Sequence, residues 1–194
     1  MAWDTDKTKQ LLLDAAVQEF AEHGLQGARV DRIAKSAGVN KERIYQYFGN
    51  KEQLFSRVLD AELGKLAAAV PMTPEAAAEL PEHVGRVYDY HQANPHFVRL
   101  LHWEALECGR EAVPAEPERT EHYVKKIGAI AEAQRRGALA ADVRPEMLMM
   151  AVMALANFWT ALPQIARMLM CGVEDDTPET RRAAIVELTR KLIA

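Results

Sequence analysis

The chain has 194 residues, of which 49% are hydrophobic and 27% are charged, and its formal net charge is -4. This balance is typical of a folded globular protein and argues against extended disorder. The two cysteines, Cys108 and Cys171, form no CxxC pair. The sequence therefore predicts no disulfide framework, zinc knuckle or cofactor. Asp4 and Asp6 at the start do not fit the basic-then-apolar order of a secretory signal, so we expect a cytoplasmic protein.

The elements taken in chain order all read as helices. Ala, Leu, Glu and Arg are frequent, apolar residues recur at intervals of three and four, and no long alternating β-branched run occurs, so the predicted fold class is all-α. The first third of the chain is expected to contain helices from Asp4 or Thr5 to Gly24, over 30–37, over 41–48 and from about residue 51.

Turn and capping residues separate these first helices. Gly38 permits a tight turn between the second and third helices. Asn40 is expected to cap the third helix, and Asn50 with Gln53 is expected to form a capping box at the start of the fourth.

Beyond Val70 the chain changes character. Prolines at 71, 74 and 81 predict a broken, Ala-rich connection, and Asn94 is expected to cap the helix that follows it. Further helices are expected from about Glu82, from Pro95, over 118–136, over 145–171 with a bend at Pro163, and over 178–193.

Charge is concentrated in the first part of the chain. Between Leu25 and Arg57, seven Lys and Arg residues accompany three Asp and Glu residues, so this segment carries +4 and the rest of the chain carries -8. A compact basic patch on an acidic body is the footprint expected when one small module binds phosphate.

The basic segment coincides with a candidate helix-turn-helix. Its apolar positions are expected to face the first helix, while five side chains point outward: Lys41, Glu42, Arg43, Gln46 and Tyr47. By periodicity alone, the same pattern also fits the solvated face of an ordinary bundle helix.

Four segments in order and spacing resemble the N-terminal domain of the TetR family. They are FAEHG (20–24), IAKSAGVNK (33–41), IYQYF (44–48) and KEQLF (51–55). The resemblance implies a homodimeric repressor that binds double-stranded operator DNA and responds to a small-molecule effector. It further implies a DNA-binding domain over 1–55 and an effector-binding and dimerisation domain over 56–194.

The resemblance also assigns residues to DNA. Residues 41–48, beginning with Lys41, would form the recognition helix in the major groove. Tyr45, Tyr47 and Lys51 match positions that contact phosphates, and Arg43 and Gln46 match positions that read bases.

One position departs from the family pattern. Relatives often have Thr or Ser before the second helix, whereas this chain has Arg29. An arginine can bind phosphate but cannot accept a hydrogen bond as a cap, so the pattern leaves the start of that helix unexplained.

Two surfaces of the larger domain carry the remaining expectations. Six of the eight Met residues lie between Met147 and Met170, and they fit either a pocket lining or a core and dimer interface. A four-helix dimer interface would use residues 145–171 and 178–193, with Ile185, Leu188 and Leu192 on one stripe. The expected effector contacts, each of which could also be a core residue, are Tyr88, His91, Phe97, Trp103, Glu104, Met150 and Trp159.

Other functional classes fit less well. The uncharged run 147–166 has the length of a membrane span, but its polar residues and proline favour a buried helix, and we expect no membrane partner. The His, Glu and Cys residues over 91–108 do not have the spacing of a metal site. No phosphate loop or catalytic motif is present, which argues against an enzyme, and the +4 segment argues against an adaptor that binds only protein.

Overall fold

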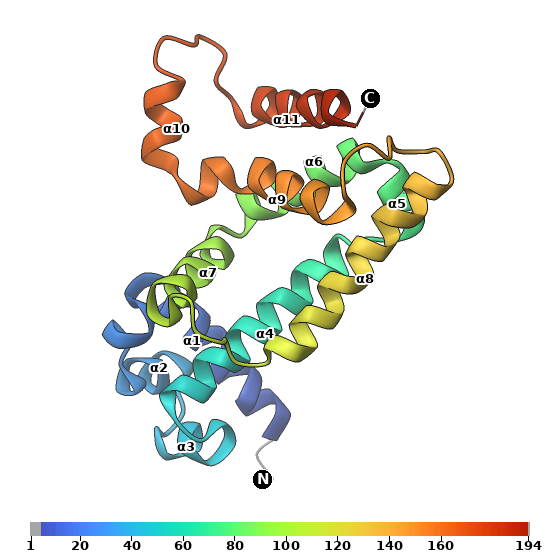
Figure 1. Cartoon of the computed structure of the whole chain (residues 1–194). Helices are drawn as coiled ribbons and strands as arrows, with labels where there is room; N and C mark the ends of the chain where they lie inside the picture. Colours follow the sequence, from blue (N-terminus) through green and yellow to red (C-terminus); the bar gives the residue numbers. More distant parts are fainter. Residues whose placement is uncertain (1–4, 194) are drawn as a thin grey trace. The chain divides into compact units, whose positions relative to one another are not determined.

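The computed structural model describes residues 5–193, and every regular element in this range is an α-helix. The predicted all-α fold class is therefore confirmed, and Asp4 lies outside the described residues. The helices in Figure 1 are α1 Thr5–Gly27, α2 Val30–Ala37, α3 Glu42–Phe48, α4 Lys51–Ala69, α5 Pro74–Ala78, α6 Leu80–Ala93, α7 Pro95–Cys108, α8 Glu116–Arg135, α9 Pro145–Ala161, α10 Pro163–Leu169 and α11 Pro178–Leu192.

The chain divides into two compact units. The first contains the described residues up to Lys65 together with His96–Glu116, and the second contains Leu66–Pro95 and the residues from Pro117 onward. The first unit thus combines the helix-turn-helix with α7, which lies about fifty residues further along the chain. The chain passes between the units within α4, at the junction of α6 and α7, and at the start of α8.

The core of the first unit follows the spacing of apolar residues along α1. Leu12, Ala16, Val17 and Phe20 recur at three and four residues, so they share one face of α1 and are buried. That face packs with Ile33 and Ala34 of α2, Ile44 of α3 and four buried apolar residues of α4. The rings of Phe20 and Phe55 meet edge to face at 5.1 Å.

The second unit is built around α6, which packs against α9 and α11. At Gly85 the backbone of α6 approaches α11 so closely that an added Cβ would lie 3.0 Å from Cγ2 of Val186. Arg182 of α11 secures the same pair of helices, because its Nε donates to Asp89 at 2.8 Å and its Nη2 donates to Glu82 at 3.3 Å.

Several predicted helix boundaries were wrong. The proline-rich connection contains the short helix α5, because Thr73 accepts a hydrogen bond from the Ala76 N–H and caps it. α6 consequently begins at Leu80 rather than Glu82. Asn94 has a role that the sequence did not predict: its side-chain nitrogen donates to the Tyr90 carbonyl at 2.9 Å and closes the end of α6.

The uncharged stretch forms two helices rather than one bent helix. α9 ends at Ala161 and α10 begins at Pro163, and the two meet at 90° because proline has no N–H to continue the α9 ladder. No single helix in residues 5–193 is long and apolar enough to cross a membrane. Only the bent pair α9 and α10 reaches that length and composition.

The predicted apolar stripe on α11 is also divided. Ile185 is fully buried in the core of the second unit, whereas Leu188 and Leu192 are about half exposed. The three residues therefore do not form one common surface. The predicted start of α11 at Pro178 is confirmed, and Thr177 and Thr180 form a capping box there.

Candidate nucleic-acid interface

A tight turn at Gly38 joins α2 to α3. Gly38 has φ 66° and ψ 29°, the left-handed conformation that residues with a Cβ rarely adopt. Its N–H donates to the Lys35 carbonyl, and the N–H of Val39 donates back to the Ala34 carbonyl at 3.0 Å. These two bonds fix the direction in which α3 leaves α2.

One residue anchors α3, and most of the helix surface is exposed. Ile44 is fully buried against the first-unit core, with Phe48 half-buried beside it. The exposed residues are Lys41, Glu42, Arg43, Tyr45 and Gln46, and Tyr47 is half-buried. The predicted cap at Asn40 is wrong, because α3 begins at Glu42 with Lys41 at the cap position and no side-chain cap.

The outward side chains of α3 contact one another. Nη1 of Arg43 donates to Oε1 of Gln46 at 2.8 Å, and the Arg43 guanidinium lies 6.0 Å from the centre of the Tyr47 ring. Nζ of Lys9 lies 5.8 Å from the same ring. Lys41 pairs with Asp31 at 3.2 Å, and the hydrogen bond from this pairing raises the Lys41 pKa. Arg43 and Gln46, one helical turn apart, thus form a single hydrogen-bonding group.

The start of α4 has the predicted capping box. The N–H of Gln53 donates to Oδ1 of Asn50 at 2.7 Å, and the N–H of Asn50 donates to Oε1 of Gln53 at 3.1 Å. The Lys51 side chain turns toward the connection between α1 and α2, where its Nζ donates to the carbonyls of Gln26 and Ala28 at 3.4 Å. Its ammonium therefore stabilises the connection between α1 and α2 in the DNA-free chain.

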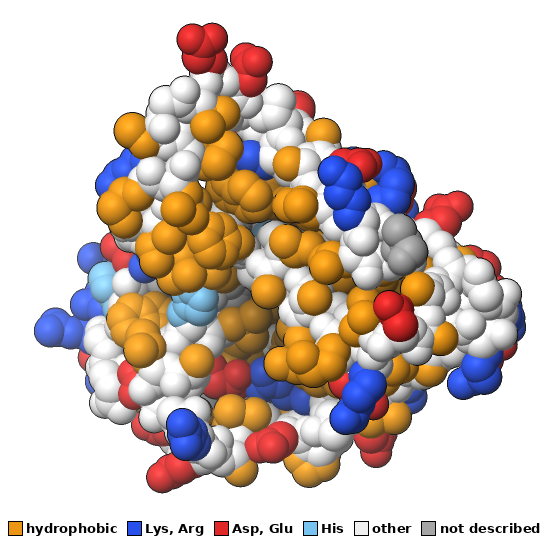
Figure 2. Space-filling view, turned by 45° about the horizontal axis from the view of Figure 1, so that its top comes forward, with side chains coloured by type: hydrophobic (Ala, Val, Ile, Leu, Met, Phe, Trp, Pro, Cys, Tyr) orange, Lys and Arg blue, Asp and Glu red, His pale blue; other side chains and the backbone are white. Residues whose placement is uncertain are grey.

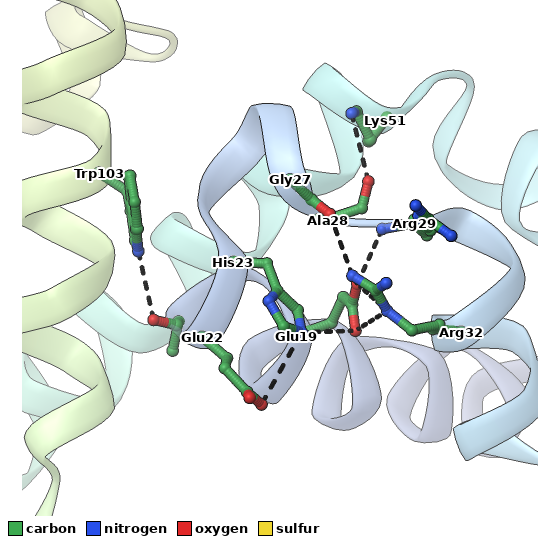
Figure 3. A network of polar contacts seen from close by, with 10 residues as sticks. Glu19, Glu22, His23, Gly27, Ala28, Arg29, Arg32, Lys51 and Trp103 are labelled. Atoms are coloured by element: carbon green, nitrogen blue, oxygen red, sulfur yellow. Dashed lines mark hydrogen bonds and ion pairs between the residues drawn. The ribbon is translucent and has the colours of Figure 1, made fainter.

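Sequence reasoning missed a second group that holds this connection. Figure 3 shows Glu19 of α1 reaching the start of α2, where its carboxylate accepts from the Arg29 N–H at 2.8 Å and from Nε of Arg32 at 2.8 Å. Nη2 of Arg32 donates to the Gly27 carbonyl at 3.0 Å. Burial raises the pKa of Glu19, but hydrogen bonds from Arg32 and the Arg29 backbone outweigh it and hold the pKa below its usual value.

α7 is attached to α1 where the latter bends. Gly24 has φ 67° and ψ -178°, so the helix is interrupted there. The Ala21 carbonyl accepts from Nε of Arg99 at 2.8 Å and from Nε1 of Trp103 at 3.2 Å. The Trp103 ring covers Gly24 so closely that an added Cβ would lie 2.6 Å from Cε3. Of these features, the sequence predicted only the helix end at His23-Gly24, and it did not predict the contacts of Arg99 and Trp103 with α1.

Two family models match this chain. The model described as "Bacterial regulatory proteins, tetR family" matches residues 12–58, and the model described as "Tetracyclin repressor-like, C-terminal domain" matches residues 79–191. The second match alone covers more than half of the chain. The chain belongs to the TetR family.

One relative and one solved structure match this TetR-family regulator over nearly its whole length, and a second relative matches about half of it. It is 39% identical over 192 residues to the HTH-type transcriptional repressor SCO4008 of Streptomyces coelicolor, covering 99% of this chain and 98% of that protein. The NicS repressor of Pseudomonas putida is 37% identical over 57% of this chain and 54% of its own. The solved structure of SCO4942 from Streptomyces coelicolor is 34% identical, with a TM-score of 0.84 and coverage of 96% and 98%. The chain is a transcriptional regulator of the repressor type and not an enzyme.

The expected effector contacts of this regulator are divided between the units. Phe97, Trp103 and Glu104 belong to the first unit, and Trp103 is engaged by α1 as described above. In the second unit the rings of Tyr88 and Trp159 meet edge to face at 6.2 Å. Met150 is 62% exposed.

Polar groups on α6 line the interior of the second unit. Nδ1 of His91 lies 3.5 Å from the Ala156 carbonyl of α9. Burial, together with the nearby charges of Arg86 and Lys126, lowers the pKa of His83 to about 4. Both imidazoles, whose pKa values burial lowers, are therefore neutral near pH 7. In the described part of the chain, no group of three or more His, Cys, Asp or Glu residues could hold a metal ion.

Proposed function

We propose that this TetR-family regulator is a ligand-responsive repressor that binds a palindromic operator as a homodimer and is released by a small, mostly apolar organic effector. The proposed functional division is a DNA-binding domain over 1–55 and an effector-binding and dimerisation domain over 56–194. The observation that carries the proposal is α3, which is anchored through Ile44 and leaves its polar face exposed.

In this proposal α3 enters the major groove. Arg43 and Gln46 read base edges, because arginine can grip guanine O6 and N7 and glutamine can pair with adenine. The 2.8 Å bond between them orients both side chains before DNA arrives. Arg29, Lys41, Tyr45 and Tyr47 are proposed to contact phosphates, and Lys51 is proposed to do so after leaving the carbonyls of Gln26 and Ala28.

The proposed dimer uses the last helices. Most of the exposed large hydrophobic side chains in residues 5–193 belong to α9, α10, α11 and the turn after α10. In Figure 2, hydrophobic side chains gather in the upper part of the view, which contains α9 and α10. The set includes Met150, Met153, Leu162, Ile165, Met168, Leu169, Leu188 and Leu192. Contiguous apolar surface of this kind supports an interface between two copies, and a two-fold dimer requires a palindromic site.

The proposed effector binds in the domain over 56–194, with Tyr88, His91, Met150 and Trp159 as candidate contacts in the second unit. The other three sequence-based candidates, Phe97, Trp103 and Glu104, belong to the first unit. The structure of FadR from Bacillus subtilis, which has the same fold at 18% identity and a TM-score of 0.68, was solved in complex with stearoyl-CoA. That complex supports a small-molecule ligand for a protein of this fold. α7 is the proposed transmitter, because it follows α6 directly and binds the Ala21 carbonyl through Arg99 and Trp103.

The deciding experiment is a footprint upstream of the protein's own gene and its neighbours, followed by anisotropy titrations of the protected duplex and a random duplex. We expect a palindromic site and a steep loss of affinity with salt for both duplexes. Replacing Arg43 with Ala should weaken binding to the operator by about 1 to 3 kcal/mol and relax the base preference at one base pair per half-site. Tyr47→Phe should weaken binding to all DNA sequences similarly. If Arg43→Ala lowers the affinity for both duplexes equally, Arg43 contacts a phosphate and does not read a base.

A further inference from the structure

We propose that Glu19 is a positioning residue for DNA binding, which holds the start of α2 from outside that helix, at a position where Arg29 supplies no side-chain cap. The proposal rests on the proposed function, because its effect is read as operator affinity. It assigns a role to a residue outside the helix-turn-helix segments.

The first step is the missing cap. The Arg29 backbone is extended, with φ -121° and ψ 121°, and its side chain makes no cap hydrogen bond. A helix usually begins with a Ser, Thr, Asp or Asn side chain that accepts a hydrogen bond from a first-turn N–H, and the loss of such a cap weakens the helix start. α2 has only eight residues, so an unsupported start would let a large part of it fray.

The second step is the geometry of the replacement. Oε1 of Glu19 accepts from the Arg29 N–H, and both carboxylate oxygens accept from Nε of Arg32, at 2.8 and 3.0 Å. Arg32 in turn donates to the Gly27 carbonyl. One carboxylate thus fixes the residue before α2, a residue in its first turn and the loop ahead of it (Figure 3). In a capping box, the acceptor for the cap-residue N–H comes from within the helix; here it comes from α1.

The third step concerns burial. The Glu19 side chain is only 10% exposed, whereas that of Glu22, one turn further along α1, is 75% exposed. A largely buried carboxylate loses water contacts, and its hydrogen bonds to Arg29 and Arg32 replace them. Because Glu19 fixes the backbone of Arg29, the Arg29 side chain does not have to act as a cap and stays available to a phosphate. Arg32 is basic but engaged by Glu19, so it is part of the support rather than the interface.

The experiment compares matched variants of the full chain. Glu19→Ala removes the support, and Glu22→Gln removes one negative charge from the exposed position. The deciding pair is E19A/R29S and E19A/R29A. Both lack Glu19 and the Arg29 guanidinium, but only serine restores a local cap. Anisotropy with the footprinted duplex gives affinity, and amide hydrogen exchange in the DNA-free protein reports the start of α2.

We expect Glu19→Ala to lower operator affinity about three- to tenfold, since a frayed α2 reduces the binding-competent fraction. A simple charge effect has the opposite sign, because removing an acidic group near DNA strengthens binding. Glu22→Gln should therefore leave affinity unchanged or slightly higher. E19A/R29S should bind more tightly than E19A/R29A. In the free protein, exchange at the Arg29 and Arg32 amides should be about tenfold faster without Glu19.

Equal affinities for the two double variants, or a Glu19→Ala affinity at or above that of the unaltered protein, would overturn the positioning role. Unaltered exchange rates would overturn the support itself. If the unaltered protein shows no preference for the footprinted duplex over a random one, the proposed function fails. The exchange rates in the free protein would then still report whether Glu19 holds α2.

Discussion

Replacing Gly24 with alanine tests the interruption of α1 and the seat of Trp103 together. Gly24 combines φ 67° with ψ -178°, a conformation that is essentially restricted to glycine. The new Cβ would also lie 2.6 Å from Cε3 and 2.7 Å from Cδ2 of Trp103, distances at which the indole must move.

The expected loss follows from these two contributions. Backbone strain of this kind costs about 1 to 3 kcal/mol. Displacing the indole lengthens the 3.2 Å bond from Nε1 of Trp103 to the Ala21 carbonyl, which contributes about 1 kcal/mol. Because Arg99 donates to the same carbonyl and can remain there, we expect Gly24→Ala to lower the free energy of unfolding by about 2 to 4 kcal/mol.

Urea unfolding followed by circular dichroism at fixed protein concentration measures this loss. The matched control is Gly64→Ala in α4, where the added Cβ meets no atom within 4 Å. That substitution should stabilise the protein by about 0.4 to 1 kcal/mol, because alanine reduces the entropy of the unfolded chain. The double variant G24A/W103A should lose less than the sum of the single losses. A Gly24→Ala protein as stable as the unaltered chain would refute the reasoning, and strict additivity would show that the indole is not displaced.

Three further predictions concern other parts of the chain. Asn50→Ala should lower the free energy of unfolding by about 1 kcal/mol in the same assay, because it removes the acceptor for the Gln53 N–H at the start of α4; no loss would mean the cap is dispensable. Since the pKa of His83 falls from 6.5 to about 4 on folding, stability is complete above pH 6.5 and decreases as the pH falls toward 4. The free energy of unfolding should fall between about pH 8 and about pH 5, and this fall should be about 2 kcal/mol larger in the unaltered protein than in His83→Gln. Leu169→Glu, at an exposed apolar position, should shift sedimentation toward monomer at micromolar concentration, and an unchanged dimer would exclude α10 from the interface.

The sequence predicted those features of the fold that depend on local patterns. The 3.6-residue period gave α1, and the apolar residues on the inner faces of α2 and α3 are buried or half-buried as expected. Asn50 and Gln53 form their capping box, because both partners lie within one turn. The predicted start of α11 at Pro178 is confirmed, because the start signal lies next to the helix. Each of these predictions uses residues no more than a turn apart.

The sequence analysis missed features in which a residue can bind more than one local partner or contacts a residue far along the chain. Asn94 lies between two helices and closes the end of α6 through the Tyr90 carbonyl, a role that its position before Pro95 does not indicate. Ile185 shares a helical face with Leu188 by spacing, but the packing of α11 on α6 buries the first and exposes the second. Glu19 and Arg29 are ten residues apart, and only the fold brings the carboxylate to the amide.

The charge of the basic segment therefore has two separate uses. By composition, all seven of its Lys and Arg residues could neutralise phosphate. In the folded chain, Arg32 is bound by Glu19, and Lys51 is bound by the carbonyls of Gln26 and Ala28. These two cations stabilise the connection between α1 and α2 by binding negative groups, which are a carboxylate in the case of Arg32 and backbone carbonyl oxygens in the case of Lys51. Arg29, Lys35, Arg43 and Arg57 are exposed. The connection between α1 and α2 thus depends on some of the same charges whose number suggested DNA binding, so in the DNA-free chain not all seven cations are unengaged.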